Sequence, residues 1–186
     1  MKKGAIIAII VVVIVVITVS LYATRDNYPA NITGTQTENK TDIFHPDPSN
    51  ATFIFDDEEI TLSAGRNENP IVPGNALIEE TVIMDKFAYG DINADGKEDT
   101  VLFLARSGGG SGTFIYLGAY VSGSLTYKGS NTIFIGDRVA PQSISINKEI
   151  VTIKYLDRKD EEAFAAEPTV LVSKQFVYKN GEFQEK

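Results

Sequence analysis

Residues 90–99 read Gly90-Asp91-Ile92-Asn93-Ala94-Asp95-Gly96-Lys97-Glu98-Asp99, and residues 101–104 continue as Val101-Leu102-Phe103-Leu104. Oxygen-bearing side chains occupy alternate positions in the first segment, and the glycine at position 96 allows a sharp bend. The second segment has no polar alternation, which is typical of a strand that is central or buried on both faces. The sequence therefore predicts a calcium loop that leads into a buried strand, and we expect the folded domain to be organised around it.

Calcium binds about 6–8 oxygen ligands from carboxylates, amides and backbone carbonyls. We expect a structural Ca²⁺ whose ligands are the side chains of Asp91, Asn93, Asp95 and Asp99 and the backbone carbonyl of Lys97. An EF-hand would place a bidentate glutamate at the twelfth loop position, where this chain has Leu102. The pattern is therefore the shorter Asp-x-Asn-x-Asp-Gly-x-x-Asp form. The alternative is a turn of Asp, Asn and Gly residues that caps the strand without a metal.

The string GDINADGKEDTVLFL resembles the calcium loop and following strand of FG-GAP and VCBS repeats. That resemblance implies a calcium ion bound beside a β-strand. A longer likeness spans residues 53–184 and includes GDINADGKEDTVLFLARSGGGSGTFIYLGAYV, FIGDRVAPQSISI, IVTIKYLDR and EPTV. Over this length the chain is similar to a group of uncharacterised bacterial secreted or envelope proteins. The likeness implies an envelope location and the limits of a domain, and it brings no activity with it.

From Thr52 onward, apolar residues recur with a period of two, and the apolar runs are separated by turn residues. We expect an all-β fold over residues 52–186, mainly an antiparallel barrel or sandwich of about 8–10 short strands. Asn180-Gly181 suits a two-residue turn, which predicts a hairpin between residues 176–178 and 182–184. A second hairpin is expected about residues 147–149. Residues 65–74 are expected to form a loop because of their Gly, Asn and Pro content.

Residues 4–23 contain no charged side chain. A helix of about 20 residues spans the hydrocarbon core of a bilayer, and in lipid the backbone must satisfy its hydrogen bonds within the segment. We therefore expect residues 4–23 to be a single transmembrane helix that anchors the chain in the cell membrane. Lys2 and Lys3 precede it, so residues 1–3 are expected to be a cytoplasmic tip and the C-terminal domain to be extracytoplasmic. The alternative is a cleaved signal peptide, whose apolar core usually has about 7–15 residues.

Residues 24–51 are rich in Asn, Thr, Asp and Pro and contain few apolar residues. Such a composition buries too little surface to offset the entropy of ordering, which predicts a flexible linker. His45, the only histidine, falls in this stretch, and we expect it to be solvated. The chain has no cysteine, so disulfides and thiolate chemistry are excluded.

The chain is acidic, with a formal net charge of −8 at pH 7. Only two of its 17 basic residues precede residue 24, and all 25 acidic residues follow it. Such a surface repels the phosphates of nucleic acid and attracts cations. We therefore expect no nucleic-acid partner.

The remaining motifs do not select a catalytic site. The acidic run Asp56-Asp57-Glu58-Glu59 lies between two strand-like segments, which favours a solvated hairpin turn over a cation patch. Residues 108–112 (GGGSG) lack the Lys-Ser/Thr pair of a phosphate loop and precede a strand. Asp137-Arg138 and Asp157-Arg158 are best explained as salt bridges at strand ends.

These features predict a membrane-anchored extracytoplasmic β domain, stabilised by calcium, that binds another envelope component, a protein or a glycan, without catalysis. The alternative is an envelope hydrolase of glycan or peptide, which would need two carboxyl groups about 5–9 Å apart in a cleft. A third alternative is a structural accessory subunit of a larger envelope complex. A deep cleft with two converging carboxylates would favour the enzyme, whereas a shallow aromatic face would favour the binding protein.

Overall fold

The computed structural model of the chain describes residues 44–74, 76–163 and 165–186. The expected cytoplasmic tip, the expected transmembrane helix at residues 4–23 and most of the expected linker lie outside this part of the chain. Among the described residues, no helix is long and apolar enough to cross a membrane.

The described residues form an all-β fold without a helix, and every pairing between strands is antiparallel, as the sequence predicts. The twelve strands are β1 (Thr52–Phe55), β2 (Glu58–Thr61), β3 (Arg66–Pro70), β4 (Ile78–Gly90), β5 (Asp99–Gly108), β6 (Phe114–Ser122), β7 (Tyr127–Gly129), β8 (Ile133–Asp137), β9 (Ala140–Asn147), β10 (Ile150–Asp157), β11 (Val170–Lys179) and β12 (Glu182–Glu185). The number exceeds the predicted one because short polar segments such as β3 also pair, although they show no hydrophobic alternation.

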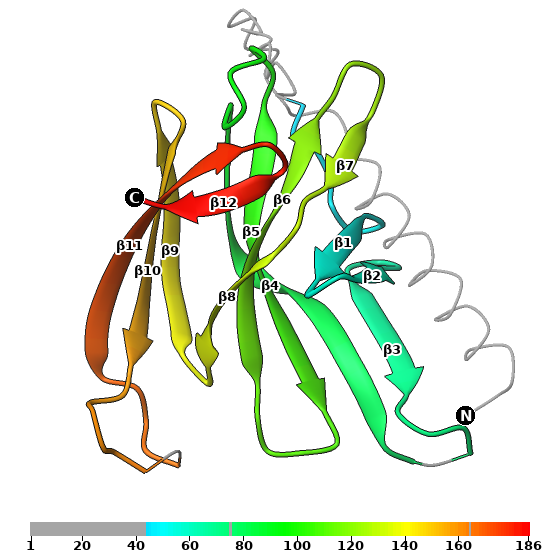
Figure 1. The fold of residues 1–186 in the computed structure, drawn as a ribbon, viewed down its shortest axis with the longest axis vertical. Coiled ribbons are helices and arrows are strands. Elements are labelled where there is room, and N and C mark those ends of the chain that lie inside the picture. Colours follow the sequence, from blue (N-terminus) through cyan, green and yellow to red (C-terminus); the bar gives the residue numbers. More distant parts are fainter. Residues whose placement is uncertain (1–43, 75, 164) are drawn as a thin grey trace, which may run out of the picture. The chain divides into compact units, whose positions relative to one another are not determined.

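The strands are arranged in three sheets. β1 and β2 form a hairpin, β9 to β12 form a four-stranded sheet, and β3 to β7 follow one another in the largest sheet, in which β8 also pairs with β6. Most strands therefore lie beside their neighbours in the chain, which makes the fold a meander of hairpins. The predicted barrel or sandwich is an open half-barrel, in which the two larger sheets curve around a common interior (Figure 1).

Strand β5 is buried on both faces, as predicted for residues 101–104. Successive side chains of a strand point to opposite faces of the sheet. Val101 and Phe103 therefore join a core with apolar residues of β6 and of the four-stranded sheet. Leu102 and Leu104 join a second core, which the hairpin β1–β2 covers. The apolar run after the loop thus links the two cores of the domain.

Three two-residue turns have positive φ angles at both central residues, as a type I′ hairpin turn requires. They are Asp56-Asp57 (46° and 73°), Lys148-Glu149 (49° and 64°) and Asn180-Gly181 (53° and 89°). The last confirms the predicted hairpin of residues 176–178 with 182–184, in which Tyr178 lies opposite Phe183. The first confirms that the acidic run contains a hairpin turn.

Part of the segment at residues 65–74, which the sequence predicts to be a loop, is the edge strand β3. Its residues pair with β4 from Arg66 opposite Val82 to Pro70 opposite Ile78. The strand is largely exposed, so its side chains carry no apolar pattern. Its pairing with a long neighbour overrides the low strand propensity of its Asn and Pro residues.

Residues 44–49, which the sequence assigns to the linker, pack against the folded domain, and we call them the strap. Pro46 is buried, and its carbonyl oxygen accepts a hydrogen bond of 2.6 Å from the hydroxyl of Thr100 in β5. The carbonyl oxygen of Ser49 accepts one of 2.7 Å from the N–H of Gly65. The domain therefore begins before Thr52, earlier than predicted, because backbone hydrogen bonds attach a segment that has few apolar residues.

Candidate functional site

The predicted ion loop, residues 91–99, joins β4 to β5. Its backbone passes through the left-handed region at Ala94 and Gly96, where φ is 62° and 80°. Asp91 stabilises this turn, because its Oδ2 accepts a hydrogen bond of 2.8 Å from the N–H of Gly96 and its Oδ1 accepts one of 3.3 Å from the N–H of Asp95. Short side chains that bond to nearby backbone N–H groups favour turns of this kind.

Asp99 is fully buried at the end of the loop. Its Oδ2 accepts a hydrogen bond of 2.9 Å from the N–H of Ile92, and its Oδ1 accepts one of 2.8 Å from the N–H of Ser122. The Ser122 hydroxyl lies 2.9 Å from the same Oδ1. Buried carboxylates are tolerated when protein donors satisfy their oxygens. Asp99 therefore connects the loop to the end of β6.

Three more side chains of the loop bond to the turn between β6 and β7. The side-chain amide of Asn93 donates to the carbonyl oxygen of Ser122 at 3.0 Å, and the Lys97 ammonium donates to that of Gly123 at 2.9 Å. The Ser122 hydroxyl lies 2.7 Å from Asp95 Oδ2, and this contact is the main reason that the pKa of Asp95 is below its ordinary value. The loop and the β6–β7 turn thus form one hydrogen-bonded unit.

The predicted calcium ligands divide into two groups. Asp95 is exposed and Asp91 and Asn93 are partly buried, whereas Asp99 is fully buried and accepts hydrogen bonds from N–H groups. The Lys97 ammonium lies 3.9 Å from Asp95 Oδ2, so a protein cation partly balances that carboxylate. Within the part of the chain that the structure describes, no group of three or more His, Cys, Asp or Glu side chains is arranged to hold a metal ion. Calcium in this loop stays a prediction.

A groove of about 550 Å³ lies between the hairpin β1–β2 and the strands β6 and β7. Tyr120 and Tyr127 stack in its lining, with ring centroids 5.4 Å apart and planes inclined by 30°. The Tyr127 hydroxyl donates to the carbonyl oxygen of Glu98 at 3.0 Å, so the ion loop also positions this ring. Burial and the nearby carboxylates of Asp99, Asp95 and Glu98 raise the pKa of Tyr127. We call this the tyrosine groove; it is lined by Asn50, Ala51, Thr52, Ile54, Glu59, Tyr120, Tyr127, Lys128 and Gly129.

The hairpin β1–β2 can form the opposite wall of the tyrosine groove because residue 129 is glycine. A Cβ atom at Gly129 would lie 2.1 Å from the carbonyl oxygen of Thr52, closer than two non-bonded atoms can approach. The next residue, Ser130, is buried, and its hydroxyl oxygen accepts a hydrogen bond of 2.9 Å from the N–H of Ala119. The Ile54 N–H of β1 donates to the carbonyl oxygen of Ser130 at 3.2 Å, so a main-chain hydrogen bond joins the two walls of the groove.

The tyrosine groove carries one carboxylate and one ammonium group, from Glu59 in β2 and Lys128 in β7. Both residues are exposed, and neither side chain bonds or pairs with another described residue. The Tyr120 hydroxyl is likewise without a hydrogen bond among the residues of known position. The groove therefore offers hydrogen-bond donors and acceptors beside two aromatic rings.

A second groove, of about 380 Å³, lies beside the strap, and we call it the strap groove. The His45 ring stacks on Tyr89 at a centroid distance of 3.9 Å, and its Nδ1 lies 2.5 Å from Glu98 Oε1. His45 is thus held by specific contacts, although the sequence predicts a solvated side chain. A β-bulge between Ile83 and Phe87 bends β4 here. The lining is mostly apolar and consists of His45, Pro46, Asp47, Pro48, Ser49, Ala64, Gly65, Ile83, Phe87, Tyr89, Thr100 and Leu102.

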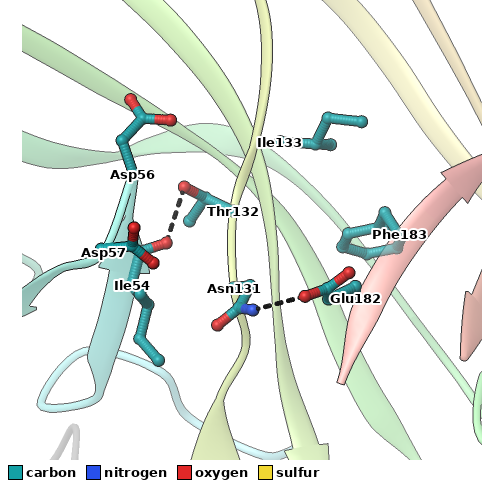
Figure 2. Close-up of a pocket in the computed structure, with 8 residues that line it drawn as sticks. All are labelled: Ile54, Asp56, Asp57, Asn131, Thr132, Ile133, Glu182 and Phe183. Atoms are coloured by element: carbon teal, nitrogen blue, oxygen red, sulfur yellow. Dashed lines mark hydrogen bonds between the residues drawn. The ribbon is translucent and has the colours of Figure 1, made fainter. Parts of the chain in front are cut away.

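A third pocket, of about 280 Å³, gathers three acidic residues, and it is lined by Ile54, Asp56, Asp57, Asn131, Thr132, Ile133, Glu182 and Phe183 (Figure 2). In Figure 2 the Asp56 carboxylate points away from Glu182, and the chain through Asn131 and Thr132 runs between Asp57 and Glu182. Glu182 accepts a hydrogen bond of 3.1 Å from the Asn131 side chain. Among the eight residues drawn, the carboxylates do not converge on one point.

The sequence predicts the ion loop but not the tyrosine groove. In the sequence, Tyr120 and Tyr127 have the pattern of ordinary strand residues on either side of the turn at residues 122–124. The only local signal is that two tyrosines flank a short Ser-Gly turn, which places them near each other on adjacent strands. Glu59 gives no signal, because it comes from a hairpin far away in the sequence.

No protein-family model, no curated protein and no solved structure matches this chain. The likeness of residues 90–104 to FG-GAP and VCBS loops and that of residues 53–184 to bacterial envelope proteins stay resemblances. The candidate site rests on its own geometry.

Proposed function

We propose that this chain is a membrane-anchored envelope protein whose extracytoplasmic β domain binds another envelope component without catalysis. In this proposal residues 4–23 anchor the chain in the cell membrane, with the N-terminus in the cytoplasm. The observation that supports binding is the tyrosine groove, in which two stacked rings lie beside a carboxylate and an ammonium group that pair with no other described residue. Aromatic side chains beside a few placed polar groups are typical of ligand sites.

The hydrolase alternative has less support from the geometry. Hydrolysis by paired carboxylates needs two carboxyl groups about 5–9 Å apart on either side of the scissile bond. The lining of the tyrosine groove contains a single carboxylate, that of Glu59. The acidic pocket contains three, but Asp56 points away from Glu182. Binding therefore explains the arrangement better than hydrolysis.

We infer a supporting role for calcium at residues 91–99. The ion would be held by the side chains of Asp91, Asn93, Asp95 and Asp99 and by the carbonyl oxygen of Lys97. Its charge would offset the repulsion among the loop carboxylates. Hydrogen bonds continue from this loop into the β6–β7 turn and to the Tyr127 hydroxyl. Calcium would therefore stabilise the wall of the tyrosine groove that carries both tyrosines.

Calcium is expected to raise the melting temperature of the full-length chain in detergent, because a ligand that binds only the folded state stabilises it by about 2.7 kcal/mol at a concentration 100 times its Kd. Thermal unfolding with millimolar calcium or with a chelator measures the shift. The double variant Asp91→Ala with Asp95→Ala should abolish it. The control, Asp160→Ala with Glu167→Ala, removes the same charge at exposed positions outside the loop and should keep it. An unchanged melting temperature in the wild-type chain would exclude calcium and leave the binding proposal standing.

Binding is tested with the detergent-solubilised full-length chain and isolated envelope fractions. We expect one fraction to retain the protein, and the double variant Glu59→Gln with Lys128→Gln to be retained several-fold less. The control is Asp160→Ala, an exposed change outside the groove. Equal retention of the groove variant and the control would contradict the assignment of binding to the tyrosine groove.

A further inference from the structure

We propose that the tyrosine groove binds a neutral saccharide, which makes the envelope component of the proposed function a glycan. This inference depends on that function, because it assigns a ligand class to the same site. It is drawn from three features of the groove: its aromatic lining, its pair of oppositely charged side chains and its limited apolar surface.

The first feature is the pair of tyrosine rings. Tyr120 and Tyr127 are both partly buried, so each exposes only part of its ring, and they stack with centroids 5.4 Å apart. Tyr127 is tethered through its hydroxyl to the carbonyl oxygen of Glu98, which leaves its ring in a set orientation. A rigid aromatic ring offers a large amphipathic contact at low entropic cost. The C–H face of a pyranose ring is a flat apolar surface that fits such a ring.

The second feature is the polar pair formed by Glu59 and Lys128. A sugar hydroxyl donates one hydrogen bond and accepts others, so a site that holds several hydroxyls needs both acceptors and donors. A carboxylate only accepts and an ammonium group only donates, and neither group is bonded to another residue whose position the structure describes. Because the two residues lie on different elements, β2 and β7, they can bond to different hydroxyls of one ligand. The Tyr120 hydroxyl adds a group that can do either.

The third feature is the charge and apolar content of the site, which argue against other ligand classes. One positive and one negative side chain nearly cancel, so the groove lacks the basic cluster that a phosphate or an acidic glycan would need. The chain as a whole carries a net charge of −8, which disfavours polyanions further. A peptide would require an apolar pocket for an anchoring side chain, and the strap groove, with its Pro, Ile, Phe and Leu lining, supplies that chemistry better.

The experiment is isothermal titration of the full-length chain in detergent with neutral tetrasaccharides: chitotetraose, cellotetraose and maltotetraose. We expect at least one to bind, and Tyr120→Ala to weaken that binding about tenfold, the typical loss for an aromatic anchor. Glu59→Gln changes an exposed side chain that makes no hydrogen bond or ion pair within the described part of the chain, and it should weaken binding about fivefold. The control is Phe134→Ala, which removes an exposed aromatic ring of β8 outside the groove and should leave binding unchanged. Melting curves confirm that each variant is folded.

Each outcome decides the proposal. Saccharide binding that is weakened by Tyr120→Ala and Glu59→Gln but not by Phe134→Ala supports it. Binding that is equal in all variants, or that Phe134→Ala alone weakens, places the saccharide elsewhere and overturns it. If no saccharide binds while an envelope fraction still retains the wild-type chain better than the groove variants, the ligand is of another class, such as a peptide, and only the proposed function stands. If neither saccharide nor envelope fraction binds, both fail.

Discussion

Asp99 has a structural role that its motif does not reveal. Its spacing from Asp91, Asn93 and Asp95 predicts a metal ligand, and the structure also buries it with two backbone N–H donors. The hydroxyl of Ser122 lies beside the same carboxylate. A buried carboxylate with this many donors is a structural junction between the loop and β6.

The substitution Asp99→Ala is expected to lower the free energy of unfolding by about 3 kcal/mol, because it leaves two buried N–H groups without an acceptor at about 1–3 kcal/mol each. Asp99→Asn keeps one carbonyl oxygen in place and should cost less. Urea unfolding of the full-length variants measures both. Asp160→Ala is the matched control, since it removes an exposed carboxylate and should change stability by less than about 0.5 kcal/mol. Equal effects of Asp99→Ala and the control would contradict the structural role of Asp99.

At the scale of elements, the strap decides where the domain begins. It adds no strand to any of the three sheets. It nevertheless places a buried proline against β5 and forms one wall of the strap groove. Its attachment depends on the hydrogen bond from the Thr100 hydroxyl to Pro46 and on the contacts of His45 with Tyr89 and Glu98. A fragment that begins at Thr52 would lack all of these contacts.

Thr100→Val tests the attachment of the strap, because valine has nearly the same shape as threonine and removes only the hydroxyl. The carbonyl oxygen of Pro46 would lose its buried donor, which is expected to cost about 1 kcal/mol and to lower the melting temperature by about 3 °C. Limited proteolysis should then cut the strap faster than in the wild-type chain. Thr126→Val, at an exposed position in the β6–β7 turn, is the control. Unchanged proteolysis in Thr100→Val would show that this hydrogen bond does not hold the strap.

At the scale of the whole molecule, acidic residues outnumber basic ones by 25 to 17, and several carboxylates are held by specific donors. The pKa of Asp137 is below its ordinary value, mainly because of hydrogen bonds from Arg138, and that of Asp95 is lowered mainly by Ser122. When the pKa of a carboxyl is lower in the folded than in the unfolded state, its contribution to stability is present above the unfolded pKa and is lost as the pH falls through the folded value.

The free energy of unfolding is therefore expected to decrease as the pH is lowered below about 4, the ordinary range of aspartate. Urea unfolding between neutral pH and pH 2 measures this decrease. Asp137→Asn removes one of the carboxyl groups responsible, so the decrease should be less steep in that variant. Asp160→Asn, at an exposed position with no bonded partner among the described residues, should follow the wild-type curve. Parallel curves for Asp137→Asn and the wild type would contradict the role of the Asp137–Arg138 pair.

The success of the sequence-based predictions depended on how local the deciding interaction is. The hairpin at Asn180-Gly181 was predictable because two adjacent residues with positive φ set it. The edge strand β3 was not, because its pairing depends on a partner such as Val82 and its own side chains are polar. The ion loop was recognisable from alternate oxygens at residues 91–99. The tyrosine groove was not, because Glu59 and Tyr120 come from strands that are distant in the chain.

By itself, the sequence determined the all-β class, the three tight turns, the burial of residues 101–104 on both faces and the acidic character of the chain. These properties follow from periodicity, turn chemistry and composition, all of which act over a few neighbouring residues. Only the tertiary structure decided that Asp99 belongs to the core, that the strap belongs to the domain and that two tyrosines line a groove. Each of these depends on contacts between segments far apart in the chain, such as Pro46 with Thr100, and no local pattern encodes them.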